Sequence, residues 1–276
     1  MPRHLIFIVM DSCRYDSFLK AETPNIDRVG SVEQRYSFAS WTSPSHQTFL
    51  MGQVPHTSPR GVFASEVYKK EFAKWVDRTG IPKLSFKSFV PQLSLPKVLK
   101  DHGYKTVARV SMPVLNNYAG FSRNFDDYRL MENHNDFAGM VEEVTFADDC
   151  PYFYFFNLGE THYPYMLNEA NLPRISGVHG VMKGMDDLLL RSSEFSDKEP
   201  EFFSPSDMAY LHQKQIDAVT YVDGVVGDLL DKCPENTYFI ITADHGELFG
   251  EDNYFGHGPV MHEKCFEVPY VEGAKP

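Results

Sequence analysis

The sequence predicts a single α/β domain, residues 1–276, with a doubly wound, mainly parallel sheet and helices on both faces. Apolar runs rich in β-branched or aromatic residues occur at 4–10, 105–110, 152–158 and 237–242. Such runs are typical of strands that are buried on both faces. Segments with helical patterns separate them, and strands that alternate with helices indicate a parallel sheet. With 276 residues, 42% of them hydrophobic, the chain can form a substantial core.

Helix starts are marked by a capping residue followed by proline. They are predicted at Pro24, Pro44, Pro96 and Pro205. The last of these helices has amphipathic spacing up to Cys233. Residues 53–92 and 165–203 lack a clear period, and we expect irregular insertions there that form a pocket.

Charge and cysteine content exclude several classes of protein. The net charge of −12 argues against binding to nucleic acid or to an anionic membrane, since both require a surplus of Lys and Arg. The four cysteines are widely spaced, which predicts free thiols in a reducing compartment. Because no signal-peptide core and no apolar run of about 18 residues is present, we expect a cytoplasmic protein.

Two of the predicted strands end in acidic residues. Asp11 follows the first strand directly, and Asp244 and His245 follow the strand at 237–242. In open α/β sheets, ligands bind at the carboxyl ends of strands. If the two strands are neighbours, these three side chains meet, and carboxylates with imidazole suit a divalent ion such as Zn or Mn.

Thr42 stands just before the helix start at Ser43 and Pro44. A hydroxyl at this place can project toward the sheet edge, where helix N–H groups favour anions. Taken alone, Thr42 is better explained as an ordinary helix cap than as a catalytic residue. Beside a metal that lowers its pKa, the hydroxyl becomes a candidate nucleophile.

The ordered set of motifs resembles the alkaline phosphatase–sulfatase superfamily. After the strand that ends in Asp11 come TPNID at 23–27, TSPSH at 42–46, DHGE at 244–247, GHG at 256–258 and VP at 268–269. The resemblance implies an alkaline phosphatase-like fold and one metal held by Asp11, Thr42, Asp244 and His245. It also implies that Thr42 is the nucleophile.

Three departures from the sulfatase pattern favour the branches that act on phosphorus. Sulfatases carry Cys or Ser at the nucleophile position, whereas this chain has Thr42, which cannot become formylglycine. They follow the first Asp with a second, where this chain has Ser12, and they pair the late Asp with Asn rather than His245. The resemblance therefore implies the chemistry of the phosphodiesterase, phosphomutase or phosphoglycerol-transferase branches.

A second metal site stays open. Two-metal relatives use an Asp-x-x-x-His pair, which is missing near NLGETHYPY, although His257 matches their last histidine. His162 and His257 are therefore predicted as substrate contacts and proton donors, with metal ligation or a purely structural role as alternatives. Glu160 and His262 are lesser candidates for substrate contacts.

Arg14 and His46 complete the predicted site. The guanidinium of Arg14 could bind a phosphate oxygen, or it could pair with Asp16 or Asp27. His46 lies one turn into the helix that follows Thr42, where it could contact substrate or orient its neighbours.

The function implied is a metal-dependent hydrolase or transferase of phosphate esters or phosphonates that forms a phosphothreonine intermediate. The partner expected is a small phosphate ester or analogue, with neither nucleic acid nor membrane, and a homo-oligomer stays open. The alternatives are a sulfuric ester hydrolase and a non-catalytic module that holds a metal or an anion.

Overall fold

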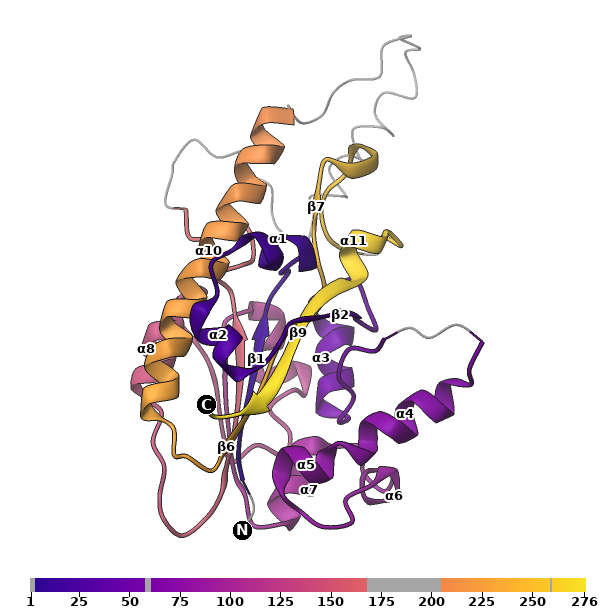
Figure 1. Cartoon of the computed structure of the whole chain (residues 1–276), viewed down its shortest axis with the longest axis vertical. Coiled ribbons are helices and arrows are strands. Elements are labelled where there is room, and N and C mark those ends of the chain that lie inside the picture. Colours follow the sequence, from indigo (N-terminus) through magenta and orange to yellow (C-terminus); the bar gives the residue numbers. More distant parts are fainter. Residues whose placement is uncertain (1–2, 58–60, 168–204, 259) are drawn as a thin grey trace.

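A seven-stranded sheet with helices on both faces forms the centre of the computed structural model (Figure 1). The structure describes residues 3–57, 61–167, 205–258 and 260–276. Its strands run in the spatial order β2-β9-β6-β1-β5-β3-β4. They span β1 His4–Met10, β2 Glu33–Tyr36, β3 Lys105–Val110, β4 Asp127–Leu130, β5 Tyr152–Leu158, β6 Thr237–Ala243 and β9 Glu267–Ala274.

Five neighbouring strands, from β6 to β4, are parallel, whereas β9 runs antiparallel to both β6 and β2. This arrangement confirms the predicted mainly parallel α/β fold. All four predicted strands are present at or within one residue of their expected limits. The strands β2, β4 and β9 were not predicted, because their short or half-exposed sequences lack a continuous apolar run.

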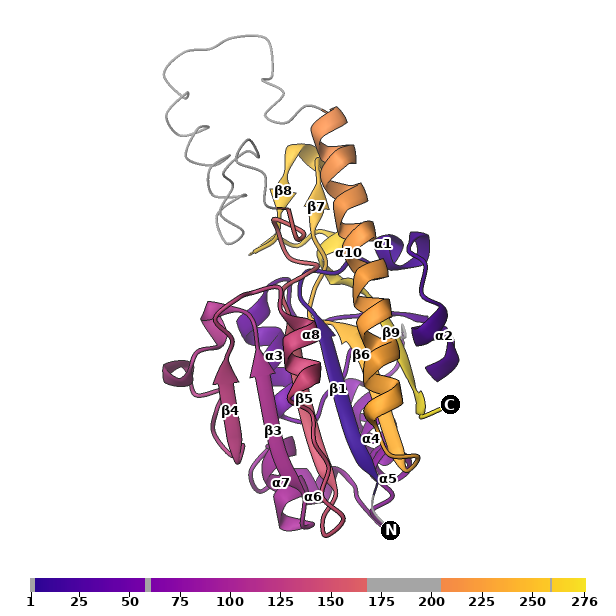
Figure 2. The ribbon, with the colours of Figure 1, turned by 90° about the vertical axis from the view of Figure 1, so that its left-hand side faces the viewer.

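The helices cover the two faces of the sheet. Those on one face are α1 Tyr15–Lys20, α2 Pro24–Val29, α8 Phe137–Glu142 and α10 Pro205–Lys232. Those on the other are α3 Thr42–Leu50, α5 Trp75–Thr79, α6 Phe86–Phe89 and α7 Leu95–Asp101, with α4 Ala64–Ala73 beside them (Figure 2). Smaller elements are η1 Pro113–Leu115, η2 Asn117–Ala119, β7 Leu248–Phe249, η3 Glu251–Asn253, β8 Phe255–Gly256 and α11 Glu263–Phe266.

Strand β1 lies in the middle of the sheet and is buried on both faces. Ile6, Ile8 and Met10 pack into the core beneath α10, and the alternate residues Phe7 and Val9 pack into the core beneath α3 and α7. This alternation explains why the strand is apolar throughout, because a solvated face would require polar residues at every second position.

The region at 53–92 differs from the irregular insertion that was predicted. It contains α4, α5 and α6, and it lies near the amino ends of the strands, away from the end that carries Asp11 (Figures 1 and 2). These helices are too short for a helical period to be recognised from sequence. Most of the second predicted insertion, its residues 168–203, falls outside the described part of the chain.

Helix α2 begins after Thr23 as predicted, but the Thr23 side chain does not cap it. The Thr23 hydroxyl donates to Asp27, whereas the N–H groups of Asn25 and Ile26 donate to the carboxylate of Asp223 on α10, at 3.0 and 2.8 Å. Asp223 is buried, so it replaces the local cap with a contact between α2 and α10.

We predict that Asp223→Ala lowers the free energy of unfolding by about 2 kcal/mol, because it leaves buried N–H groups without an acceptor. Urea unfolding followed by circular dichroism measures this loss. Asp217→Ala, which removes an exposed carboxylate from the same helix, is the matched control and should change stability by less than about 0.5 kcal/mol. Equal losses in the two variants would contradict the capping role.

Candidate active site

The acidic residues that follow β1 and β6 lie side by side. The two strands are parallel neighbours in which Met10 is opposite Ala243, so Asp11 and Asp244 leave the sheet at the same level. Both carboxylates and the adjacent His245 are completely buried. Potential ligand atoms of the three residues all lie within 4.8 Å of one another. His245 Nε2 is 3.4 Å from Asp244 Oδ2 and 3.8 Å from Asp11 Oδ1.

Thr42 joins this cluster from the other side. It is the first residue of α3 rather than the residue before it, and its hydroxyl donates to His245 Nε2 at 3.3 Å. Helix α3 is fixed there because the Ser45 hydroxyl donates to the backbone carbonyl of Asp244 at 2.7 Å. All four residues predicted to hold one metal are therefore brought together.

Hydrogen bonds hold each ligand in a defined orientation. The Nδ1–H of His245 donates to the carbonyl of Gly246 at 2.9 Å, which leaves the Nε2 lone pair facing Thr42 and the carboxylates. Asp244 Oδ1 accepts from the backbone N–H groups of Ser12 and His245, at 3.1 and 3.0 Å. Asp11 accepts from Asn157 Nδ2 at 3.0 Å and from the Ser12 hydroxyl at 3.1 Å.

The electrostatics of the cluster fit a bound cation. Burial, together with the neighbouring Asp11, raises the pKa of Asp244 well above its usual value. Burial also lowers the pKa of His245 well below its usual value, which keeps the imidazole neutral. Asp244 Oδ2 is buried and has no hydrogen-bond partner among the described residues. Two buried carboxylates, one of which has an oxygen without a partner, are costly unless a positive charge compensates them. These residues therefore fit a divalent metal.

His162 and His257 lie next to this cluster. The His257 ring is 4.3 Å from that of His245 and 5.2 Å from that of His162, measured between centroids. The Nδ1–H of His162 donates to the Tyr163 carbonyl at 2.7 Å, and its buried Nε2 has no partner among the described residues. His257 Nδ1–H donates to Glu247 at 2.9 Å, and Glu247 also accepts from the Tyr165 hydroxyl. Both imidazoles are therefore oriented beside the candidate metal site.

Arg14 and His46 have other partners. The Arg14 guanidinium pairs with Asp16 at 2.7 Å and also with Glu251, so one of the two alternative pairings considered for it is present. The Nδ1–H of His46 donates to the Thr42 carbonyl at 2.9 Å and lies 3.5 Å from Asp244 Oδ2. Burial lowers the pKa of His46 to about 4, so this ring is neutral and buttresses the first turn of α3.

Glu160 and His262 do not reach the cluster. Glu160 Oε1 accepts from the N–H of Phe137, the first residue of α8, at 2.7 Å. His262 is partly exposed and caps α11, where its Nδ1 accepts from Lys264 N at 3.1 Å. Among the described residues, no second group of three or more potential metal ligands is found.

Four supporting residues were missed by the sequence analysis. Ser12 and Asn157 hold Asp11, Glu247 holds His257, and Gln215 on α10 donates to the carbonyls of Ser12 and Thr161. The signals were present but weak. Asn157 is the one polar residue inside the run YFYFFNL, and Gln215 lies on the buried side of an amphipathic helix.

The family model described as Sulfatase matches residues 3–272, and the chain therefore belongs to the Sulfatase family. This match and the structural neighbours confirm the resemblance to the alkaline phosphatase–sulfatase superfamily. A search of curated proteins finds no match. No helix in the described ranges is both long and apolar enough to cross a membrane.

Several solved structures share the fold over 99% of this chain. The zinc complex of the C-terminal periplasmic domain of EcEptC from Escherichia coli has a TM-score of 0.60 at 15% identity, with 73% of its length covered. Phosphonate monoester hydrolase of Agrobacterium radiobacter gives 0.59 at 14%, with 68% covered. BT1596, a 2-O GAG sulfatase, gives 0.57 at 11%, with 64% covered. At these identities the likeness establishes the fold.

We predict that Glu160→Gln removes a pH-dependent part of the stability. Burial raises the pKa of Glu160 to about 7. A carboxyl whose pKa is higher in the folded state stabilises that state only while protonated, so its contribution falls as pH rises from about 4.3 to about 7. Relative to wild type, Glu160→Gln should therefore gain up to about 3 kcal/mol between roughly pH 4 and pH 8.

Urea unfolding of both proteins across this pH range measures that difference, and titration of the metal ligands cancels because it is common to both. A difference between variant and wild type that stays constant with pH would contradict the raised pKa.

Proposed function

We propose that this protein is a metal-dependent hydrolase or transferase of phosphate esters or phosphonates, with Thr42 as its nucleophile. The observation that carries the proposal is the position of the Thr42 hydroxyl, 3.3 Å from His245 Nε2 within the group formed by Asp11, Asp244 and His245. The hydroxyl also lies at the amino end of α3, where free backbone N–H groups favour an anionic substrate.

Asp11, Thr42, Asp244 and His245 would hold the metal, with zinc and manganese both compatible with this mixture of ligands. When bound, the ion supplies positive charge that lowers the pKa of a hydroxyl and neutralises phosphate oxygens. The protein contributes the placement of these groups. Asn157 and Ser12 fix Asp11, and the Gly246 carbonyl fixes the tautomer of His245.

The reaction proceeds by two displacements at phosphorus. Thr42 Oγ1 loses its proton to solvent and forms a bond to phosphorus while the bond from phosphorus to the leaving oxygen breaks, which gives a phosphothreonine. Water or an acceptor alcohol then bonds to the same phosphorus and loses a proton, while the bond from phosphorus to Thr42 Oγ1 breaks and this oxygen takes up a proton.

A proton must reach the leaving oxygen in the first step. His162 or His257 would donate it from Nε2 as an imidazolium, because the Nδ1–H groups of the two rings stay bonded to Tyr163 and Glu247. General acid catalysis of this kind contributes roughly a hundredfold to ten-thousandfold in rate. Because Glu247 accepts from His257 Nδ1, it sets the tautomer and the direction of this ring.

Sulfuric esters are the second candidate substrates, because the matching family model is that of Sulfatase. A threonine nucleophile favours phosphorus over sulfur here, since it cannot be converted to formylglycine. Phosphate and phosphonate esters are therefore placed first.

Elemental analysis and a substrate panel test the proposal. We expect a bound transition metal, with turnover of an aryl phosphate monoester, diester or phosphonate exceeding that of the sulfate ester. Thr42→Ala should lower this turnover by roughly a thousandfold or more, and chelation should abolish it until metal is restored. Ser43→Ala, which alters the neighbouring hydroxyl, is the matched control and should stay near wild type.

Full turnover by Thr42→Ala would contradict the nucleophile assignment. Bound metal without turnover of any ester in the panel would favour a non-catalytic module that holds a metal or an anion.

The role of Glu247 is tested separately. Glu247→Ala removes the acceptor for His257, and we expect kcat to fall by roughly ten- to a hundredfold while metal content stays unchanged. Glu247→Gln keeps an acceptor oxygen for His257 and should retain most of the activity. Equal losses in the two variants would contradict a positioning role that depends on this hydrogen bond.

A further inference from the structure

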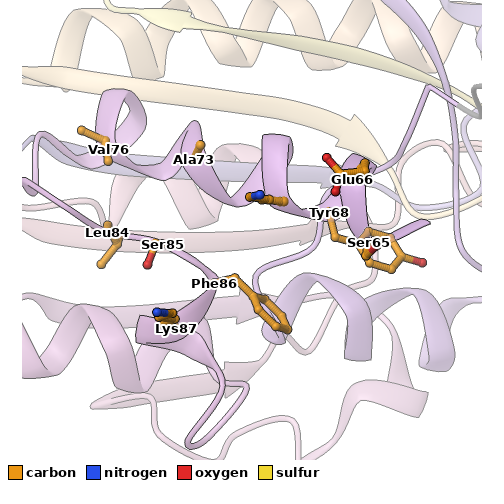
Figure 3. Close-up of a pocket in the computed structure, with 10 residues that line it drawn as sticks. Ser65, Glu66, Tyr68, Ala73, Val76, Leu84, Ser85, Phe86 and Lys87 are labelled. Carbon is orange, nitrogen blue, oxygen red and sulfur yellow. The ribbon is translucent and has the colours of Figure 1, made fainter. Parts of the chain in front are cut away.

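A pocket lies between α4, α5 and α6, far from the group formed by Asp11, Asp244 and His245. Its volume is about 590 Å³, within the range of small-molecule sites. Its apolar lining includes Tyr68, Ala73, Val76, Leu84 and Phe86. Figure 3 shows Ala73 and Val76 on one side, with Leu84 and Phe86 on the facing segment. The reaction proposed above does not use this pocket.

The pocket and the metal cluster lie at opposite ends of the sheet. Helix α5 is anchored beside the amino end of β1, where the N–H of Arg3 donates to the Thr79 carbonyl at 2.8 Å. Asp11 follows the carboxyl end of the same strand. Because a seven-residue strand is roughly 20 Å long, a ligand in the pocket cannot contact Thr42 directly.

Two lysines line the pocket together with its apolar groups. Lys69 and Lys87 are exposed, and neither forms an ion pair with any residue that the structure describes. Glu66 is the acidic residue in the lining, so the lysines are in excess. An apolar cavity with more ammonium than carboxylate groups in its lining is complementary to an aliphatic chain with an anionic head group.

The surrounding segment reverses the charge of the rest of the protein. Residues 61–90, which contain α4, α5 and α6, have six Lys and Arg against three Asp and Glu, although the whole chain has 26 against 38. The net charge of −12 that argued against an anionic membrane therefore hides a basic region. Long-range repulsion between exposed charges is screened beyond about 10 Å at ordinary salt, so the local excess governs what binds there.

The same region exposes large apolar side chains. Phe63, just before α4, is 82% exposed, and Phe86, Val90 and Leu93, in or after α6, are 44%, 49% and 40% exposed. Scattered lysines with exposed aromatic and aliphatic residues are typical of surfaces that lie on a bilayer. A small anionic solute would account for the lysines but not for these exposed side chains.

We propose that the α4–α6 region docks onto an anionic membrane, with one acyl chain of a lipid in the pocket and its head-group phosphate near Lys69 and Lys87. This inference is independent of the reaction at Thr42. The α4–α6 region would then be a lipid-binding surface of the protein, and the end of the sheet that carries Thr42 would face away from the bilayer.

Vesicle co-sedimentation tests this proposal. The intact protein should sediment with vesicles made of equal parts phosphatidylcholine and phosphatidylglycerol, and not with phosphatidylcholine alone. Since each basic residue near an anionic surface contributes about fivefold in binding, the Lys69→Glu, Lys87→Glu pair should bind at least about 30-fold more weakly. Ala73→Trp, which fills the pocket without changing the charge, should also weaken binding.

The matched control is the Lys20→Glu, Arg28→Glu pair, which changes the net charge equally on exposed positions of α1 and α2. It should bind as wild type does, and unchanged thermal unfolding should show that all variants are folded. Absence of wild-type binding to the anionic vesicles would overturn the proposal, as would equal losses in the two charge-reversal pairs. Binding of dispersed lauric acid without vesicle binding would also overturn it. Hydrolysis of a soluble aryl ester by every variant should be unaffected, which separates this test from that of Thr42.

Discussion

Two carboxylates that cannot both be charged without compensation determine the organisation of this molecule. Asp11 and Asp244 are fully buried at the ends of adjacent parallel strands, and one oxygen of Asp244 has no partner among the described residues. Hydrogen bonds from the surrounding polar groups reach only some of the carboxylate oxygens. Everything else at this end of the sheet is arranged around that remaining negative charge, including the neutral imidazole of His245 and the amino end of α3.

The turn after Asp244 brings a second constraint. Gly246 lies so close to the chain near Lys264 that a Cβ would come within 1.9 Å of the Lys264 carbonyl oxygen. The N–H of Gly246 also donates to the Cys265 carbonyl at 2.9 Å. The segment that leads into β9 therefore packs directly on the turn that carries the ligands, and only glycine allows this approach. The segment before the antiparallel strand β9 thus holds the turn after Asp244 in place.

The sequence was sufficient to predict the central strands and to single out Asp11, Asp244 and His245, which the fold brings together. These features depend on patterns that a chain displays locally, namely continuous apolar runs and the polar residues that end them. Thr42 was singled out by the helix start that follows it and by the family resemblance. The supporting contacts could not be predicted in this way. The partners of these side chains are distant in the sequence: Asn157 bonds to Asp11, 146 residues away, and Gln215 to Ser12, 203 residues away. Glu247 accepts from Tyr165, 82 residues away. The polarity of such a side chain does not by itself reveal its partner. The opposite also occurs, because Arg14 has the chemistry for a phosphate contact in the sequence but is paired with Asp16 in the structure.

The order of the strands along the chain has a consequence for biosynthesis. Strand β1 is the first element, yet its two neighbours in the sheet are β5 and β6, which begin at Tyr152 and Thr237. During synthesis, the apolar strand β1 therefore has neither partner until β5 is made, and it lacks β6 until the chain reaches Thr237. Contacts of such long range make folding slow and expose a strand edge to aggregation in the meantime. The nascent chain is accordingly expected to depend on chaperones that shield β1 until its neighbours have been made.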